Sequence, residues 1–142
     1  MIAVVILFII CAYILHNTRE PYEFTDVKER YRILREHLKE TDDPKFRVLH
    51  RHVPITGFTQ MKNTVGYNTN KGGEITICLN GGVNEIFHVL IHELAHSTVK
   101  EYSHSPEFWE NYVELRNIAQ NLNIYEKIPQ KTKFCGQHVQ DK

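Results

Sequence analysis

The sequence predicts an α+β fold, in which a small antiparallel sheet packs on a central helix and an N-terminal hydrophobic helix comes first. Three observations carry this prediction. Residues 64–79 have the pattern of two short strands around a turn, residues 84–95 are apolar on almost every face of a helix, and the first fifteen residues contain no charge. The 142 residues suffice for one domain with a modest core.

The apolar N-terminus, MIAVVILFIICAYIL, is expected to be a single-pass membrane anchor over residues 1–18. A helix of fifteen residues rises only about 22 Å, short of a hydrocarbon core of roughly 30 Å, but residues 16–18 can extend it through the interface. A cleaved signal peptide, which would leave the domain secreted, and a buried core helix are the alternatives. All nearby basic residues follow the apolar run, so the positive-inside rule places the domain in the cytosol.

Charge and cysteine content limit the classes of partner. Seventeen basic and seventeen acidic residues cancel and no basic stretch stands out, so we expect no nucleic-acid binding. We expect a monomer that acts on a protein or peptide. The three cysteines, Cys11, Cys78 and Cys135, form no CxxC pair and no even set, which favours a reducing compartment.

The main domain is expected over residues 19–125, followed by a polar C-terminal tail at 126–142. Thr25 is the predicted N-cap of its first helix, which should end before Asp42. Its apolar residues recur at helical spacing: Val27, Tyr31, Leu34 and Leu38. The segment FRVLHRHV, residues 46–53, alternates loosely and is interpreted as a strand.

The next elements are a hairpin and two helices. Asn70 to Gly73 supply the left-handed conformations that a hairpin turn needs. In the second strand, Ile75, Ile77 and Leu79 share the face expected to lie on a helix. Asn84 is the predicted cap of the central helix, and a last helix should begin with Ser105 as N-cap and Pro106 at the first helical position.

The central helix carries the motif HELAH. His92 and His96 are four residues apart, so their side chains leave one face about 5–6 Å apart and can hold one zinc ion. Glu93 lies about 100° around the axis, where it can take a proton from a zinc-activated water as general base. The string alone is a weak signal, but its place on a buried helix strengthens it, because buried His and Glu need partners.

His104 is the favoured third zinc ligand. The seven intervening residues contain no glycine, which permits a gradual return of the chain to the metal. A carboxylate of the last helix, Glu114 or its neighbours Glu107 and Glu110, is the alternative. His88 lies about 12 Å from His96 along a straight helix and is interpreted as a packed histidine, and Cys78 should point away from the helix. Tyr102 on the return loop is a candidate oxyanion donor, although packing is the commoner role of such a tyrosine.

These residues resemble the WLM-type and SprT-like minimal zinc metallopeptidases and the bacterial YgjP-like group. The likeness rests on HELAH, the third histidine and the Phe108–Trp109 pair. The preceding GYNTNKGGEITICLN is similar to a segment in hypothetical metallopeptidases of large DNA viruses. The resemblance spans residues 66–122 and implies a zincin-like fold, Zn²⁺ bound by the three histidines, and Glu93 as the catalytic glutamate. WLM-type and SprT-like members often act on DNA–protein crosslinks through added DNA-binding segments, whereas this chain has no basic stretch.

The sequence therefore predicts a membrane-anchored zinc metalloendopeptidase. If the strand over residues 74–79 lies at a sheet edge, it can bind an extended peptide by strand addition. Two other classes remain: a zinc-stabilised membrane adaptor without catalysis, and a metal-dependent hydrolase of a non-peptide substrate.

Overall fold

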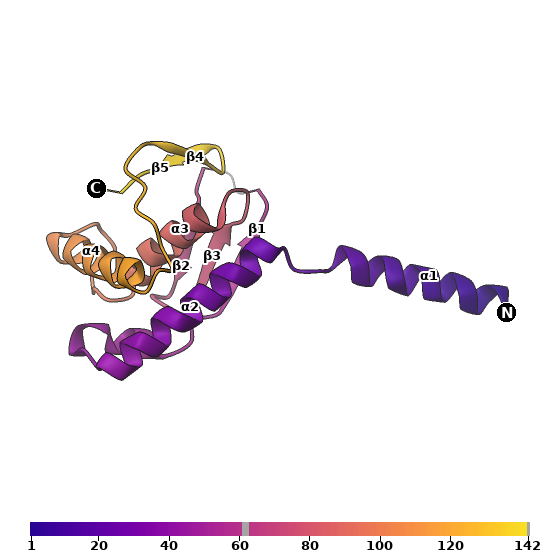
Figure 1. Cartoon of the computed structure of the whole chain (residues 1–142), viewed down its shortest axis with the longest axis horizontal. Coiled ribbons are helices and arrows are strands. Elements are labelled where there is room, and N and C mark those ends of the chain that lie inside the picture. Colours follow the sequence, from indigo (N-terminus) through magenta and orange to yellow (C-terminus); the bar gives the residue numbers. More distant parts are fainter. Residues whose placement is uncertain (61–62, 142) are drawn as a thin grey trace.

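A computed structural model describes residues 1–60 and 63–141 of the chain. Its helices are α1 (Ile2–Asn17), α2 (Tyr22–Thr41), the 3₁₀ helix η1 (Pro44–His50), α3 (Val83–His96) and α4 (Pro106–Asn121). Its strands are β1 (Ile55–Phe58), β2 (Gly66–Thr69), β3 (Glu74–Cys78), β4 (Thr132–Phe134) and β5 (Gln137–Val139). The elements from α2 onward gather around α3, while α1 stands apart (Figure 1).

Within the described part of the chain, helix α1 is exposed along its whole length. None of its residues is buried, although its side chains are almost all apolar. Among the residues that the structure describes, no single helix has both the length and the apolar character to cross a membrane. Helices α1 and α2, bent by 52° relative to each other, meet those criteria only as a pair.

Helix α2 buries the predicted apolar stripe. Val27, Tyr31, Leu34 and Leu38 are all at most 3% exposed. The helix begins at Tyr22, three residues before the expected cap at Thr25, and ends at Asp42 in the left-handed conformation. Its inner face therefore forms one side of the core.

The strand expected over residues 46–53 is wrong, because most of this segment lies in η1. The Asp43 carboxylate accepts a hydrogen bond from the Lys45 amide, and Pro44 follows at the first helical position. These are signals for the start of a helix. Phe46 and Leu49, three residues apart, fall on the same side of a 3₁₀ helix and are both buried. This three-residue spacing, and not the alternation of a strand, explains why both side chains are buried.

The main sheet is mixed, not antiparallel as expected. Its order is β1-β3-β2, with β3 antiparallel to β2 and parallel to β1. The predicted hairpin is confirmed, with Asn70, Lys71 and Gly72 at φ angles of 52°, 47° and 99°. Strand β3 is central, so the edge predicted at residues 74–79 belongs instead to β2 on one side and β1 on the other.

Helix α3 occupies the centre of the domain, as its composition predicts. It contacts α2, α4, β2 and β3, and its apolar residues are buried on several faces. The expected cap at Asn84 is wrong, since Gly82 is the N-cap. The Asn84 amide instead pairs with the backbone N–H and C=O of Glu126, at 2.8 and 2.7 Å. This pair fastens the segment after α4 to the start of α3.

Helix α4 begins as predicted. The Ser105 hydroxyl accepts a hydrogen bond from the Phe108 amide at 3.1 Å, and Pro106 is the first helical residue. Phe108, Tyr112, Leu115 and Ala119 are buried on the side that faces α3. The capped start fixes where α4 meets the loop that precedes it.

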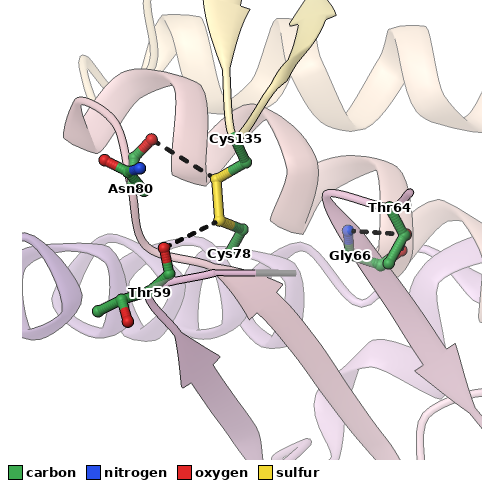
Figure 2. Close-up of a disulfide and its surroundings, with 6 residues drawn as sticks. All are labelled: Thr59, Thr64, Gly66, Cys78, Asn80 and Cys135. Carbon is green, nitrogen blue, oxygen red and sulfur yellow. Dashed lines mark hydrogen bonds between the residues drawn. A yellow bond between two sulfur atoms is a disulfide. The ribbon is translucent and has the colours of Figure 1, made fainter. Parts of the chain in front are cut away.

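The C-terminal segment is folded, in contrast to the polar tail that its composition suggested. Strands β4 and β5 form a second, two-stranded sheet, and Cys135 between them forms a disulfide with Cys78 of β3 (Figure 2). This disulfide is at odds with the reducing compartment that the cysteine count favoured. Because Cys11, exposed on α1, makes the number of cysteines odd, that number alone does not indicate the disulfide. Cys78 is oxidised and has no thiolate to offer a metal.

Candidate metal centre

Three histidines converge at one point beside α3. The Nε2 atom of His104 lies 3.0 Å from that of His92 and 3.1 Å from that of His96. A ligand nitrogen from each of the three falls within 4.8 Å of the others. Two nitrogens bound to one tetrahedral zinc at 2.0–2.1 Å are about 3.3 Å apart. The three predicted ligands thus form a group of the right size for one metal ion.

An aromatic platform from α4 supports the three imidazoles. The Phe108 ring centroid lies 5.0, 4.4 and 4.7 Å from those of His92, His96 and His104. Trp109 approaches His92 and His104 at 6.3 and 5.4 Å. Rings packed in this way lose little freedom when they bind a metal, because their orientation is already restricted. The Phe–Trp pair of the motif therefore acts as a floor for the histidines.

His96 is held in its neutral form. Burial lowers its pKa to about 4, and electrostatic interactions with the nearby His104 and Lys71 side chains lower it further. Neutral imidazole is the form that coordinates zinc. His96 is therefore ready to bind at neutral pH without losing a proton.

Glu93 lies on α3 beside the histidine cluster and is 7% exposed. Burial raises the pKa of its carboxyl to about 7. A carboxyl with a pKa near neutrality can both accept and return a proton, which is the requirement for a general base in hydrolysis. Glu93 borders two pockets that meet at the metal centre, so it is accessible from the cleft despite its burial.

The loop that carries His104 is fastened at two places. The Lys71 ammonium donates to the carbonyls of Val99 and Glu101, the first at 2.7 Å. The Asn111 amide of α4 donates to the Thr98 hydroxyl at 2.8 Å. These contacts hold the first half of the return loop, and the Ser105 cap of α4 holds its far end, so His104 reaches the other histidines without a glycine in the loop.

The competing ligands lie elsewhere. His88 is buried, with its Nδ1 atom 3.0 Å from the Tyr125 hydroxyl and 3.4 Å from the Asp141 carboxylate. Its interpretation as a packed histidine is confirmed. Glu114 and Glu110 pair with Lys45, and neither joins the histidine group. Glu107 is exposed in the first turn of α4.

Tyr102 lies at the rim of the cleft. Its side chain is 80% exposed, and the Lys71 ammonium sits 4.5 Å from the centre of its ring. It lines the cleft together with the three histidines and Glu93. Tyr102 is thus near the candidate centre, with most of its side chain in solvent.

Strand β2 forms the wall of the cleft opposite α3. Gly66, Tyr67 and Asn68 line it, and in the described part of the chain β2 pairs only with β3. The Asn68 amide donates to the Glu93 carbonyl at 2.8 Å and to the Ser97 hydroxyl at 2.7 Å. This side chain fixes the strand to the metal-binding helix and leaves its outer edge open.

Sequence reasoning missed Asn68 and Lys71 as supporting residues. Both lie in the predicted hairpin, and only their contacts with α3 and the return loop, about 25 to 30 residues away, reveal their role. The one local signal was a lysine at a turn position that requires a left-handed conformation, where glycine or asparagine is usual.

Comparisons with known proteins give two likenesses. No protein-family model matches the chain. The chain is 31% identical over 80 residues to an uncharacterised protein, R325, of Acanthamoeba polyphaga mimivirus, in a match that covers 49% of this chain and 41% of the relative. The matched region is therefore less than half of the relative's length.

Among solved structures, the chain is similar to the crystal structure of the metallopeptidase zymogen of Pyrococcus abyssi abylysin. The identity is 27%, the TM-score is 0.43, and the match covers 67% of this chain and 97% of that one. A TM-score of this size is too low to assign a fold or an activity. The resemblance to WLM-type and SprT-like peptidases stays a prediction, and the function proposed below rests on the geometry of the site.

Proposed function

We propose that the chain is a membrane-anchored zinc metalloendopeptidase. The observation that carries this proposal is the convergence of His92, His96 and His104 beside the buried carboxyl of Glu93, in a cleft bordered by a free strand edge. Three imidazoles with space for a fourth ligand are typical of catalytic zinc, whereas structural zinc sites are usually closed by four protein ligands. Zn²⁺ is therefore the metal that the donor set fits best.

The residues around the metal divide the chemistry between them. His92, His96 and His104 would hold the Zn²⁺, which would supply Lewis acidity for polarising a carbonyl and acidifying a water. Glu93 accepts the proton of the attacking water and returns it to the leaving amine, since its pKa of about 7 suits both steps. The packed aromatic rings beneath the histidines keep the ligands in place during this cycle.

The open edge of β2 supports a peptide as substrate. An extended chain that adds to this edge forms backbone hydrogen bonds and passes over His92 and Glu93, because β2 borders the same cleft. Asn68 fixes the separation between the strand and α3. Strand addition needs an extended backbone, so unfolded segments and flexible loops are the expected targets.

Tyr102 is proposed to stabilise the oxyanion. Its exposed hydroxyl can donate a hydrogen bond to a substrate oxygen that becomes negatively charged during attack. Tyr102→Phe should lower kcat by about ten-fold or more while zinc content and KM change little. An unchanged kcat would leave Tyr102 as a rim residue with no part in the chemistry.

Membrane anchoring is proposed for α1. Its apolar side chains are exposed on every face, and no part of the described domain covers them. The cytosolic orientation stays a prediction from the basic residues that follow α1. The Cys78–Cys135 disulfide favours the opposite side, since disulfides persist in oxidising compartments. Protease protection of sealed vesicles, read together with thiol alkylation, distinguishes the two orientations.

Metal content and proteolysis together test the proposed activity. The full chain should bind one zinc ion and cleave an unfolded protein; a chelator should abolish cleavage, and added zinc should restore it. His104→Ala should lose zinc to a sub-stoichiometric chelator, whereas the matched control His52→Ala, an exposed histidine outside the site, should retain it. Full zinc retention by His104→Ala would contradict the ligand assignment.

The same experiment separates the alternatives. Bound zinc without cleavage of any protein would favour the membrane adaptor. Zinc-dependent cleavage of an ester or another small substrate, with proteins left intact, would favour a hydrolase of non-peptide substrates.

A further inference from the structure

A second pocket lies next to the metal centre and shares Glu93 with the main cleft. Its cavity volume is about 280 Å³, and Gly66, His92 and Glu93 line both this pocket and the main cleft. The two spaces therefore meet beside His92 and Glu93, where the proposed hydrolysis would take place. A peptide that lies along β2 would place a side chain from beside the scissile bond into this pocket.

The walls of this pocket combine apolar and polar side chains. Val65, Val89, Trp109 and Val139 contribute to them, together with the ring of Tyr112. Among the described residues that line the pocket, the polar ones are His88, His92, Glu93, His138 and Gln140, and none is a lysine, arginine or aspartate. His88 is bonded to Tyr125, and His92 and Glu93 are assigned to the metal and the chemistry, so a charged substrate side chain would find only His138 and Gln140 as partners. A large apolar side chain would be buried against the valines and Trp109.

The C-terminal hairpin supplies one wall. His138, Val139 and Gln140, from β5 and the residue after it, line the pocket. At the turn of the hairpin, the disulfide joins Cys135 to the central strand β3 (Figure 2). The wall is thus attached covalently to the sheet that carries β2.

The other end of the hairpin is fixed by Asp141, whose side chain is fully buried. Its carboxylate accepts hydrogen bonds from the Tyr112 and Tyr125 hydroxyls and from the Ile128 amide, and it lies 3.4 Å from His88. Tyr112 also packs against the ring of His92, with centroids 5.9 Å apart. The wall and the metal-binding helix are therefore held in one frame.

We propose that this hairpin, with Val139 and His138 as its determining residues, selects the substrate residue beside the scissile bond and favours a large apolar side chain there. The inference rests on the proposed peptidase activity and adds its substrate preference. It gives a role to the two anchors, Cys135 and Asp141, which the hydrolytic chemistry does not use.

Cleavage-site mapping tests the inference. The full chain, solubilised in mild detergent with zinc, is incubated with an unfolded protein, and the fragments are identified by mass spectrometry. Wild type should cut preferentially beside Leu, Ile, Phe or Met. Val139→Phe fills the pocket and should reduce cleavage at those sites at least about ten-fold relative to sites with Gly, Ala or Ser. Gln137→Phe, on the same hairpin but outside the pocket, is the matched control and should keep the wild-type pattern.

A second variant avoids the buried position. His138 is exposed, so His138→Glu should fold normally and place a carboxylate at the pocket, which should raise cleavage beside Lys and Arg about two- to five-fold. Gln137→Glu adds the same charge outside the pocket and should not. An identical cleavage pattern in wild type, Val139→Phe and His138→Glu would overturn the inference alone. Absence of cleavage by zinc-loaded wild type would overturn the proposed function, and the inference with it.

Discussion

The Cys78–Cys135 disulfide should contribute strongly to the stability of the domain. The two cysteines are 57 residues apart in sequence. In the chain-entropy treatment, a cross-link that closes a loop of this length restricts the unfolded chain by about 4 kcal/mol at 25 °C. Reduction should therefore lower the free energy of unfolding by about 4 kcal/mol, a large share of the roughly 5–15 kcal/mol that stabilises a typical domain.

Urea unfolding of the metal-free chain measures this effect. A chelator in both samples removes the contribution of bound metal, and a phosphine reductant in one sample opens the disulfide without any substitution. With a slope of about 2 kcal/mol per molar urea, the midpoint should fall by about 2 M on reduction. The Cys78→Ala, Cys135→Ala double variant should show no further change with reductant. A midpoint shift below about 0.5 M would refute the reasoning, because it would mean that the C-terminal hairpin is not held by the cross-link.

The remaining predictions concern Asp141, Gly66 and Lys71. Burial alone would raise the pKa of Asp141, but hydrogen bonds from His88, the Tyr125 hydroxyl, the Ile128 amide and the Tyr112 hydroxyl outweigh it and hold the pKa well below its ordinary value. The stability that this carboxylate provides is therefore fully present above about pH 4 and is lost as the pH falls further. Asp141→Asn should lower the free energy of unfolding at pH 7 by about 2–4 kcal/mol. In urea titrations, the stability of this variant should also depend less on pH in the acid range. A Cβ at Gly66 would lie 2.6 Å from Val89 Cγ1, so Gly66→Ala should cost about 1–3 kcal/mol, and Val89→Ala in the same chain should recover part of it; additive losses would contradict the contact. Lys71→Met should weaken zinc binding about ten- to hundred-fold in chelator competition, because the loop that carries His104 loses its tie to the hairpin; unchanged affinity would show that the loop holds its place without Lys71.

Local patterns predicted the elements that carry the site. The stripe of α2, the left-handed turn at residues 70–72, the apolar character of α3 and the Ser105–Pro106 start of α4 are all confirmed. Each depends on residues within one or two turns of the chain. The histidine triad could be predicted for a related reason, because helix geometry fixes His92 and His96, and the capped start of α4 limits where His104 can lie.

Features that depend on distant contacts were not predicted. Strand β1 pairs in parallel with β3, and parallel pairing leaves no turn signal in the sequence. The C-terminal segment has no regular apolar period, yet Ile128, Phe134 and Val139 are buried by contacts with elements far back in the chain. The odd number of cysteines favoured a reducing compartment and gave no signal for the disulfide, since the third cysteine, Cys11, lies on α1. The second pocket depends on these same contacts, and for that reason the sequence indicated no specificity pocket.

The central claim is that Glu93 is the base of a zinc peptidase, and one paired measurement tests it most directly. Zinc-loaded wild type and Glu93→Gln are compared at equal zinc content for cleavage of the same unfolded protein, with the exposed-site variant Glu40→Gln as matched control. Glu93 is not one of the three residues that form the histidine group. The Glu93→Gln substitution should therefore leave one zinc ion per chain in place. The account predicts that Glu93→Gln keeps its zinc and loses cleavage by at least about a hundred-fold, whereas Glu40→Gln cleaves like wild type. Full cleavage by zinc-loaded Glu93→Gln would contradict it.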